Sequence, residues 1–192
     1  MLVRRTVSTI LTTITALCAS AVPTATVHAA APEVLNCLTN AAVHFSPPLS
    51  ATAQAVTVTI AGTVSGCTDS QTGATAITGG RVTTTLHFAS LSCNPLLPAT
   101  LKPGASAAFT WNLANGTRAG STVTGLALSQ IAGAGTLTGT VTGSSPRLAG
   151  EHLTSLLNID SDQPIIDNCV DVLLGIGAPI ANSTLTADIA FG

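Results

Sequence analysis

Aliphatic side chains alternate with threonine or serine through much of this chain, and this period of two restricts the fold more than any other feature. Between Gln54 and Ser65, Val56, Val58, Ile60 and Val64 share one face and threonines predominate on the other. The clearest apolar row consists of Ala107, Phe109, Trp111 and Leu113. Such alternation is typical of strands with one buried face, because successive side chains point to opposite sides of a sheet.

The same pattern predicts further strands over residues 81–92, 121–131, 136–142, 148–157 and 184–191. About eight strands at regular spacing favour an all-β fold, an antiparallel sandwich or barrel. Leu91 is out of phase with Phe88, which indicates a β-bulge in its strand. Asn115-Gly116 predicts a type I′ hairpin turn, because both residues tolerate positive φ.

One segment departs from the strand pattern. Residues 167–175 begin with Asp167, contain Cys169 and end with Gly175, which predicts a short helix near Cys169. Loops are expected at 68–75, 94–105, 143–146 and 158–164. No segment has the composition of an interdomain linker, so we expect one domain.

The N-terminus has the three parts of a secretory signal. Arg4 and Arg5 are basic, residues 6–22 carry no charge and are moderately apolar, and Val27-His28-Ala29 places small residues at the cleavage site. The sequence therefore predicts a signal peptide over 1–29 and a single secreted β-domain over 30–192. We expect no transmembrane span after cleavage, because the apolar stretch is short and rich in threonine.

The export route is open from the sequence. Arg4-Arg5-Thr6-Val7 partly matches a twin-arginine signal. Disulfides normally form after export, however, which favours the general secretory route. Cys18 lacks the preceding residues of a lipoprotein motif and is interpreted as an apolar residue of the signal.

Four cysteines remain beyond the signal: Cys37, Cys67, Cys93 and Cys169. An even number in an exported chain predicts two disulfides. If the strands 54–65 and 81–92 form a hairpin, Cys67 and Cys93 lie at its opposite ends, too far apart to bond. Cys37 precedes these strands and is expected at the open end. We therefore predict the pairs Cys37–Cys93 and Cys67–Cys169. No Cys-x-x-Cys is present, so no metal site is expected.

Charge and aromatic content exclude several classes of partner. After cleavage four basic residues remain against eight acidic ones, a formal charge of −4. Nucleic acid is not expected as a partner, because phosphate binding needs a basic face. The charged fraction is 7% against about 25% in typical proteins, which fits an exported domain with a hydroxyl-rich surface. Exposed aromatic platforms for sugar stacking are scarce, since the chain has one Trp and no Tyr.

No sequence motif points to catalysis. Gly104-Ala105-Ser106 resembles the start of a serine hydrolase elbow but lacks the final glycine and leads into a strand. The histidines His44, His87 and His152 are scattered, and His87 is expected to face solvent. We therefore expect no catalytic residues, no cofactor and no enzyme activity.

Four acids form the one local charge cluster: Asp160, Asp162, Asp167 and Asp171. Asp-x-Asp can begin a calcium loop, but Pro164 follows and the other EF-hand positions are absent. A solvated loop followed by a helix is the favoured interpretation, and a weak Ca²⁺ site is the alternative. Asn115 and Asn182 lie in formal glycosylation sequons and are interpreted as a turn residue and a strand residue.

Motifs spread over residues 37–187 resemble a family of small secreted all-β proteins of actinobacteria that have no assigned activity. The residues that carry this resemblance are Cys37, His44–Pro47, Val56–Val58, Gly62–Cys67, Leu91–Cys93, Thr110–Asn112, Gly139–Thr142, Leu148–Gly150, Cys169 and Leu185–Ala187. The segment 94–105 departs from it, being longer and richer in proline. The resemblance implies an exported all-β domain and assigns no catalytic residue.

Three functions are compatible with these features. The leading hypothesis is a secreted or cell-envelope-associated, non-enzymatic β-domain with a structural or interaction role, whose candidate partners are a cell-wall component or a second copy. The alternative is a binding module for a small apolar ligand or a cell-wall polymer, at a sandwich cleft or barrel mouth rimmed by 96–98. The third, a hydrolase assembled from distant residues, has no motif in its favour.

Overall fold

The computed structural model describes residues 34–94, 97, 99–131, 134–158 and 163–192, with the side chains of 130, 131, 134, 158 and 163–167 left aside. The elements of this part of the chain, in order, are β1 (Leu35–Leu49), β2 (Gln54–Asp69), β3 (Ile77–Leu91), β4 (Thr100–Leu101), β5 (Ser106–Leu113), β6 (Arg118–Ile131), β7 (Ala134–Val141), β8 (His152–Asn158), α1 (Gln163–Leu173) and β9 (Ile180–Phe191). The predicted signal peptide over 1–29 lies outside the described residues and stays a prediction. Within the described residues, no helix has the length and apolar character needed to cross a bilayer.

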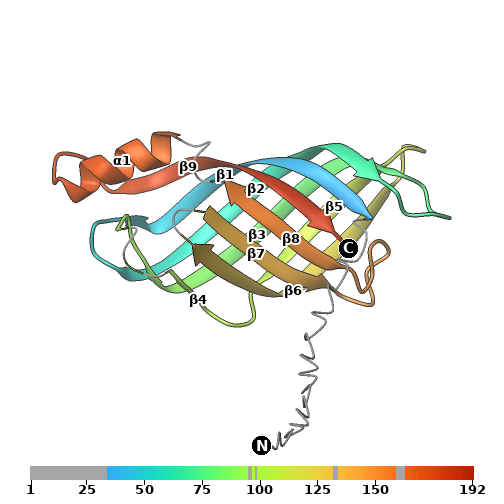
Figure 1. Ribbon diagram of the computed structural model, residues 1–192, viewed down its shortest axis with the longest axis horizontal. Coiled ribbons are helices and arrows are strands. Elements are labelled where there is room, and N and C mark those ends of the chain that lie inside the picture. Colours follow the sequence, from blue (N-terminus) through green and yellow to red (C-terminus); the bar gives the residue numbers. More distant parts are fainter. Residues whose placement is uncertain (1–33, 95–96, 98, 132–133, 159–162) are drawn as a thin grey trace, which may run out of the picture. The chain divides into compact units, whose positions relative to one another are not determined.

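Eight of the strands close into one antiparallel barrel (Figure 1). Each long strand pairs with the next along the chain, and β9 returns to pair with β1, from Leu35 opposite Phe191 to His44 opposite Asn182. The short strand β4 is additional to these eight. It pairs with the part of β3 that follows the residues paired with β5. The expected all-β antiparallel fold is confirmed, and of the two architectures considered it is the barrel.

Closure of the barrel depends on β1, a strand that the sequence pattern does not reveal. Its inward residues include Cys37, Val43 and Phe45, but Thr39 also faces inward and Leu38 faces outward. These two positions break the apolar alternation on which strand recognition rests. Because β1 pairs with both β2 and β9, it joins the first and last strands of the sheet and leaves the barrel without an open edge there.

The antiparallel order gives the barrel two chemically different ends. One end contains the start of β1, the end of β2 and the end of β9, and we call it the capped end. The other end contains the start of β9 and the segment that includes α1, and we call it the helix end. In Figure 1 the helix end, marked by α1, lies opposite the end at which β9 reaches the C-terminus.

The interior is built from the inward faces of the strands, as the alternation predicts. In β3, Val82, Thr84, Leu86 and Phe88 are all buried. The expected bulge at Leu91 is confirmed, because the register between β2 and β3 shifts between Gln54–Leu91 and Val56–Phe88. His87 lies on the exposed face of the same strand, as expected.

Two local details refine the sequence interpretation. The short helix near Cys169 is present as α1, and it begins before the expected Asp167. The turn at Asn115-Gly116 differs from the prediction, because Gly116 has a φ of 81° and Asn115 has no positive φ. Gly116 N–H donates to the Leu113 carbonyl at 2.9 Å, and Leu113 N–H donates to the Thr117 carbonyl at 3.0 Å. This is a three-residue loop with glycine at the bulge position instead of a two-residue type I′ turn.

Candidate functional site

Two disulfides are present, but their pairing differs from the predicted one. Cys37 bonds Cys67, and Cys93 bonds Cys169. The predicted pairs Cys37–Cys93 and Cys67–Cys169 were wrong because Cys37 belongs to β1 and does not precede the sheet. In the β1–β2 register, Asn36 lies opposite Thr68 and Leu38 opposite Ser65, with a bulge between them, so Cys37 is adjacent to Cys67. Cys67 and Cys93 do lie at opposite ends of the β2–β3 hairpin, as expected.

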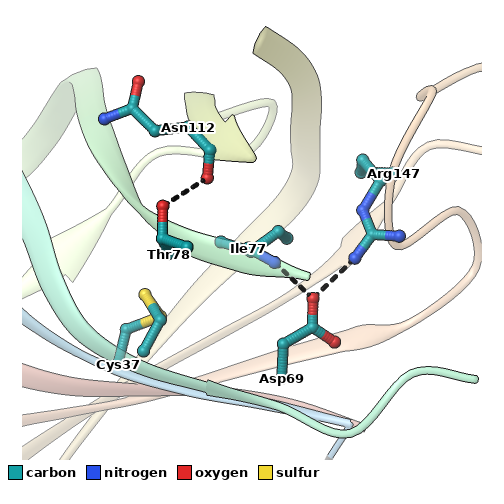
Figure 2. The surroundings of a disulfide bond; sticks show 7 residues. Cys37, Asp69, Ile77, Thr78, Asn112 and Arg147 are labelled. Atoms are coloured by element: carbon teal, nitrogen blue, oxygen red, sulfur yellow. Dashed lines mark hydrogen bonds and ion pairs between the residues drawn. A yellow bond between two sulfur atoms is a disulfide. The ribbon is translucent and has the colours of Figure 1, made fainter. Parts of the chain in front are cut away.

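The capped end holds a buried ion pair between residues 78 positions apart. The Arg147 guanidinium donates from Nη2 to Asp69 Oδ2 at 2.7 Å, and the side chains are 8% and 1% exposed. Asp69 Oδ2 also accepts the Ile77 N–H at 2.7 Å, and Asp69 Oδ1 accepts the Gln71 N–H at 3.0 Å. Figure 2 shows Asp69 between Ile77 and Arg147, close to Cys37. The carboxylate therefore joins the end of β2, the start of β3 and the β7–β8 loop.

A second polar contact attaches the same loop to the aromatic core. Trp111 Nε1–H donates to Ser121 Oγ at 2.9 Å, and the Ser121 hydroxyl donates to the Arg147 carbonyl at 2.7 Å. Trp111 stacks on Phe109 with ring centroids 4.9 Å apart, and the edge of Phe191 meets both rings. Leu148 follows Arg147 into the interior and is 1% exposed. This end of the barrel is thus sealed by side chains.

Sequence reasoning missed this cluster. Asp69 fell in an expected loop at 68–75, and Arg147 came directly after the expected loop at 143–146. The one available signal was the scarcity of charge. Only four basic residues lie beyond position 29. If one of them is buried, it needs an acidic side chain as its ionic partner, and that acid would have to lie far away in the sequence. Spacing alone does not identify that acid.

Several inward-facing side chains nearest the helix end are buried, Val56 and Leu49 among them, but four aliphatic ones in the same half of the barrel are only partly buried. These four residues are Ile60, Leu128, Leu157 and Leu185, and we call them the lumen quartet. Each lies in the half of its strand nearest the helix end. A methyl group at Gly135 would lie 3.4 Å from Leu157 and 3.7 Å from Leu128, so these two leucines meet over the same glycine.

Ile60 lies between buried residues of both neighbouring strands. It lies within β2, opposite Val43 of β1 and Thr84 of β3, and both of these neighbours are buried. Strands therefore cover Ile60 on both sides. Its side chain is on the inward face of β2 and is nevertheless only partly buried.

Small residues line the wall beside the quartet, towards the middle of the barrel. Ala41 lies opposite Gly62 and Leu185, and Thr39 lies opposite Ala187. An eight-stranded barrel is just wide enough for side chains to fill or for one small ligand. Thr39 is 7% exposed, and its hydroxyl has no hydrogen-bond partner among the described residues. This wall is therefore apolar, and the Thr39 hydroxyl is enclosed within it.

The helix end also carries exposed apolar side chains outside the barrel. On and after α1 they are Val170, Leu173, Leu174 and Ile176, the last being 76% exposed. Val172 faces the opposite way and is buried. Of the expected rim residues, Leu97 is 42% exposed, whereas 96 and 98 lie outside the described residues. The Cys93–Cys169 bond ties α1 to the segment that follows β3.

The residues considered for catalysis are not brought together. His44 meets the Asn182 amide oxygen at 2.8 Å, His87 meets Thr57 at 3.1 Å and His152 meets Thr140 at 3.2 Å. In each case the partner atom belongs to an amide or a hydroxyl, and the three histidines lie on different strands. Ser106 opens β5 with its side chain exposed.

The acidic cluster is only partly described. Asp160 and Asp162 lie outside the described residues, as does the side chain of Asp167. Asp171 is exposed on α1, and its backbone carbonyl accepts hydrogen bonds from Ile176 and Gly177 at 3.0 Å. Among the described residues, no group of three or more potential metal ligands was found. The Ca²⁺ alternative therefore stays a prediction.

Comparison with known proteins did not place the chain in a family, since no family model, curated protein or solved structure matched it. What is established is an eight-stranded antiparallel barrel with an extra strand, a short helix and two disulfides. Two disulfides indicate an oxidising compartment such as the cell exterior.

Proposed function

We propose that this chain is an exported, non-enzymatic binding domain whose barrel takes a small apolar ligand at the helix end. The observation that carries the proposal is the lumen quartet, in particular Ile60, an inward side chain that is only partly buried although strands cover it on both sides. By contrast, the inward-facing Leu35 and Ile77 at the capped end are 0% and 2% exposed. We place the entry of the ligand at the helix end, because all four members of the quartet lie in that half of the barrel.

The lining suggests what kind of ligand this is. Leucine and isoleucine provide apolar contact without a charge, so a charged group would lose hydration and gain no partner in return. A compact, mostly hydrocarbon molecule matches this chemistry, and each buried methylene contributes about 0.8 kcal/mol.

A pair of adjacent leucines provides a matched test. Leu157 faces the lumen, whereas its neighbour Leu156 faces outward and is 55% exposed. Binding of the neutral fluorophore N-phenyl-1-naphthylamine would be titrated against the natural protein and the variants Leu157→Trp and Leu156→Trp. We expect Leu157→Trp to weaken binding at least tenfold by filling the lumen, and Leu156→Trp to leave it unchanged. Circular dichroism would verify that both variants are folded.

Equal binding by the two variants would exclude the lumen as the site. Native mass spectrometry of the protein purified without organic solvent provides a second readout, since a co-purified neutral molecule would identify the ligand directly. Absence of any saturable binding to the folded natural protein would overturn the proposal.

We further propose that the exported protein associates with the cell envelope through the exposed apolar side chains on and after α1. Four large apolar residues within seven positions are unusual on a surface with so few charges, and contiguous apolar surface often marks an interaction site. Co-sedimentation of the folded protein with isolated cell walls tests this. We expect pelleting that Leu174→Ser with Ile176→Ser abolishes. Pelleting of reduced, unfolded protein to the same extent would indicate nonspecific adhesion instead.

A further inference from the structure

The outer face of the barrel carries a groove that is separate from the lumen. It has a volume of about 390 Å³ and is lined by Leu38, Thr39, Asn40, Ser65, Thr186, Ala187 and Asp188. This size falls within the usual range of ligand sites, roughly 300–1,000 Å³. The groove lies on the side of the sheet opposite the lumen, because Leu38 and Asp188 are exposed whereas Thr39 and Ala187 face inward.

The Asp188 carboxylate, which lines the groove, lies between two exposed leucines, of which Leu38 also lines the groove and Leu156 does not. In the strand register, Asp188 of β9 lies opposite Leu38 of β1 on one side and Leu156 of β8 on the other. The two leucines are 56% and 55% exposed. Side chains directly opposite each other on neighbouring strands have Cβ atoms about 5 Å apart, so the three form one continuous row.

The charge of this row has no ionic partner among the described residues. The ion pair among the described residues joins Arg147 to Asp69, and no described lysine or arginine pairs with Asp188. Ser65, opposite Leu38 on β2, and Asn40, two residues along β1, add a hydroxyl and an amide oxygen to the groove. The groove therefore offers one anionic and two neutral hydrogen-bond acceptors beside an apolar surface.

We propose that this groove binds a lysine side chain of a partner protein. A lysine combines an apolar four-carbon stem, which would pack along Leu38, with an ammonium that would pair with the Asp188 carboxylate. Arginine fits less well, because its planar fork is best matched by two coplanar acceptors. The formal net charge of −2 for the whole chain also favours a basic partner.

The test uses small probes that differ only at the end of the side chain. Nα-acetyl-lysine amide carries the ammonium, and Nα-acetyl-norleucine amide has a similar stem without it. We expect saturable shifts of the Leu38, Asn40 and Asp188 amide signals in ¹⁵N–¹H NMR spectra with the lysine probe, at a Kd on the order of millimolar. The norleucine probe should bind several-fold more weakly.

Two exposed acids provide matched variants. Asp188→Asn should weaken lysine binding roughly threefold to fivefold, the range for an exposed ion pair. Asp171→Asn, on α1, should leave it unchanged. Equal binding of the two probes, unchanged binding in Asp188→Asn, or shifts located away from the groove would each overturn the proposal. Because the groove and the lumen lie on opposite faces of the sheet, neither result depends on whether the lumen binds a ligand.

Discussion

Arg147 and Asp69 form a buried ion pair at 2.7 Å, although they lie 78 residues apart in the sequence. The pair closes the capped end by attaching the β7–β8 loop to the junction of β2 and β3. Its position beside the Cys37–Cys67 disulfide places a covalent and an ionic link at the same end of the barrel (Figure 2).

Removing one member of this pair should be far more harmful than removing both. We expect Arg147→Met alone, which leaves the Asp69 carboxylate buried without its cation, to lower the free energy of unfolding by about 3–5 kcal/mol. The double variant Arg147→Met with Asp69→Asn should recover part of this loss, because no uncompensated charge remains. Urea unfolding measures both. A double variant less stable than the single one would show that the Asp69 carboxylate stabilises the fold without Arg147, through its hydrogen bonds with Ile77 and Gln71.

Ser121 should be needed to satisfy two buried groups at once. Ser121→Ala removes the acceptor of the Trp111 indole N–H and the donor to the Arg147 carbonyl. Leaving a buried group unpaired costs about 1–3 kcal/mol, so we expect a loss of that size. Because the chain has one tryptophan, its fluorescence reports the site directly. Ser121→Thr, which keeps a hydroxyl, is the matched control, and equal losses in the two variants would point to packing.

The two disulfides should stabilise different parts of the barrel. Replacing Cys93 and Cys169 by serine should lower stability by about 2–5 kcal/mol and accelerate hydrogen exchange in the described part of α1. Replacing Cys37 and Cys67 should instead accelerate exchange at the start of β1. Peptide mapping under non-reducing conditions first verifies the pairing. The same exchange pattern in both variants would contradict this division.

Gly139 should not tolerate a side chain. A methyl group there would lie 2.6 Å from Val123 and 2.9 Å from Leu126, both buried, so Gly139→Ala would overpack the interior. We expect a loss of about 1–3 kcal/mol in thermal or urea unfolding. Gly143→Ala is the control, since no atom lies within 4 Å of the corresponding position. Equal stability of the two variants would show that Val123 and Leu126 move aside.

The limits of sequence reasoning are clear at particular residues. The row in β5 could be identified because Phe109, Trp111 and Leu113 are apolar at every second position. The row in β3 could be identified because Val82, Leu86 and Phe88 keep the same phase around the single Thr84. β1 could not, because Thr39 is buried and Leu38 exposed. The wrong cysteine pairing follows from this one omission, since Cys37 reaches Cys67 only through β1.

The candidate sites could not be predicted from the sequence for a similar reason. The Asp69–Arg147 pair, the lumen quartet and the Leu38–Asp188–Leu156 row each join residues from separate strands. A sequence pattern reports which face of its own strand a residue occupies, and not which residue of another strand lies opposite. That information comes from register, which bulges such as the one between Asn36 and Leu38 shift by single residues.

By itself, the sequence determined the all-β class, the faces of several strands, the short helix near Cys169 and the presence of enough cysteines for two disulfides. These depend on local periodicity and composition, which act over a few residues. Only the tertiary structure decided between barrel and sandwich, which cysteines pair, and which residues form the buried ion pair. These outcomes depend on contacts between distant strands, such as β1 with β9, where the closure of the whole sheet selects one register.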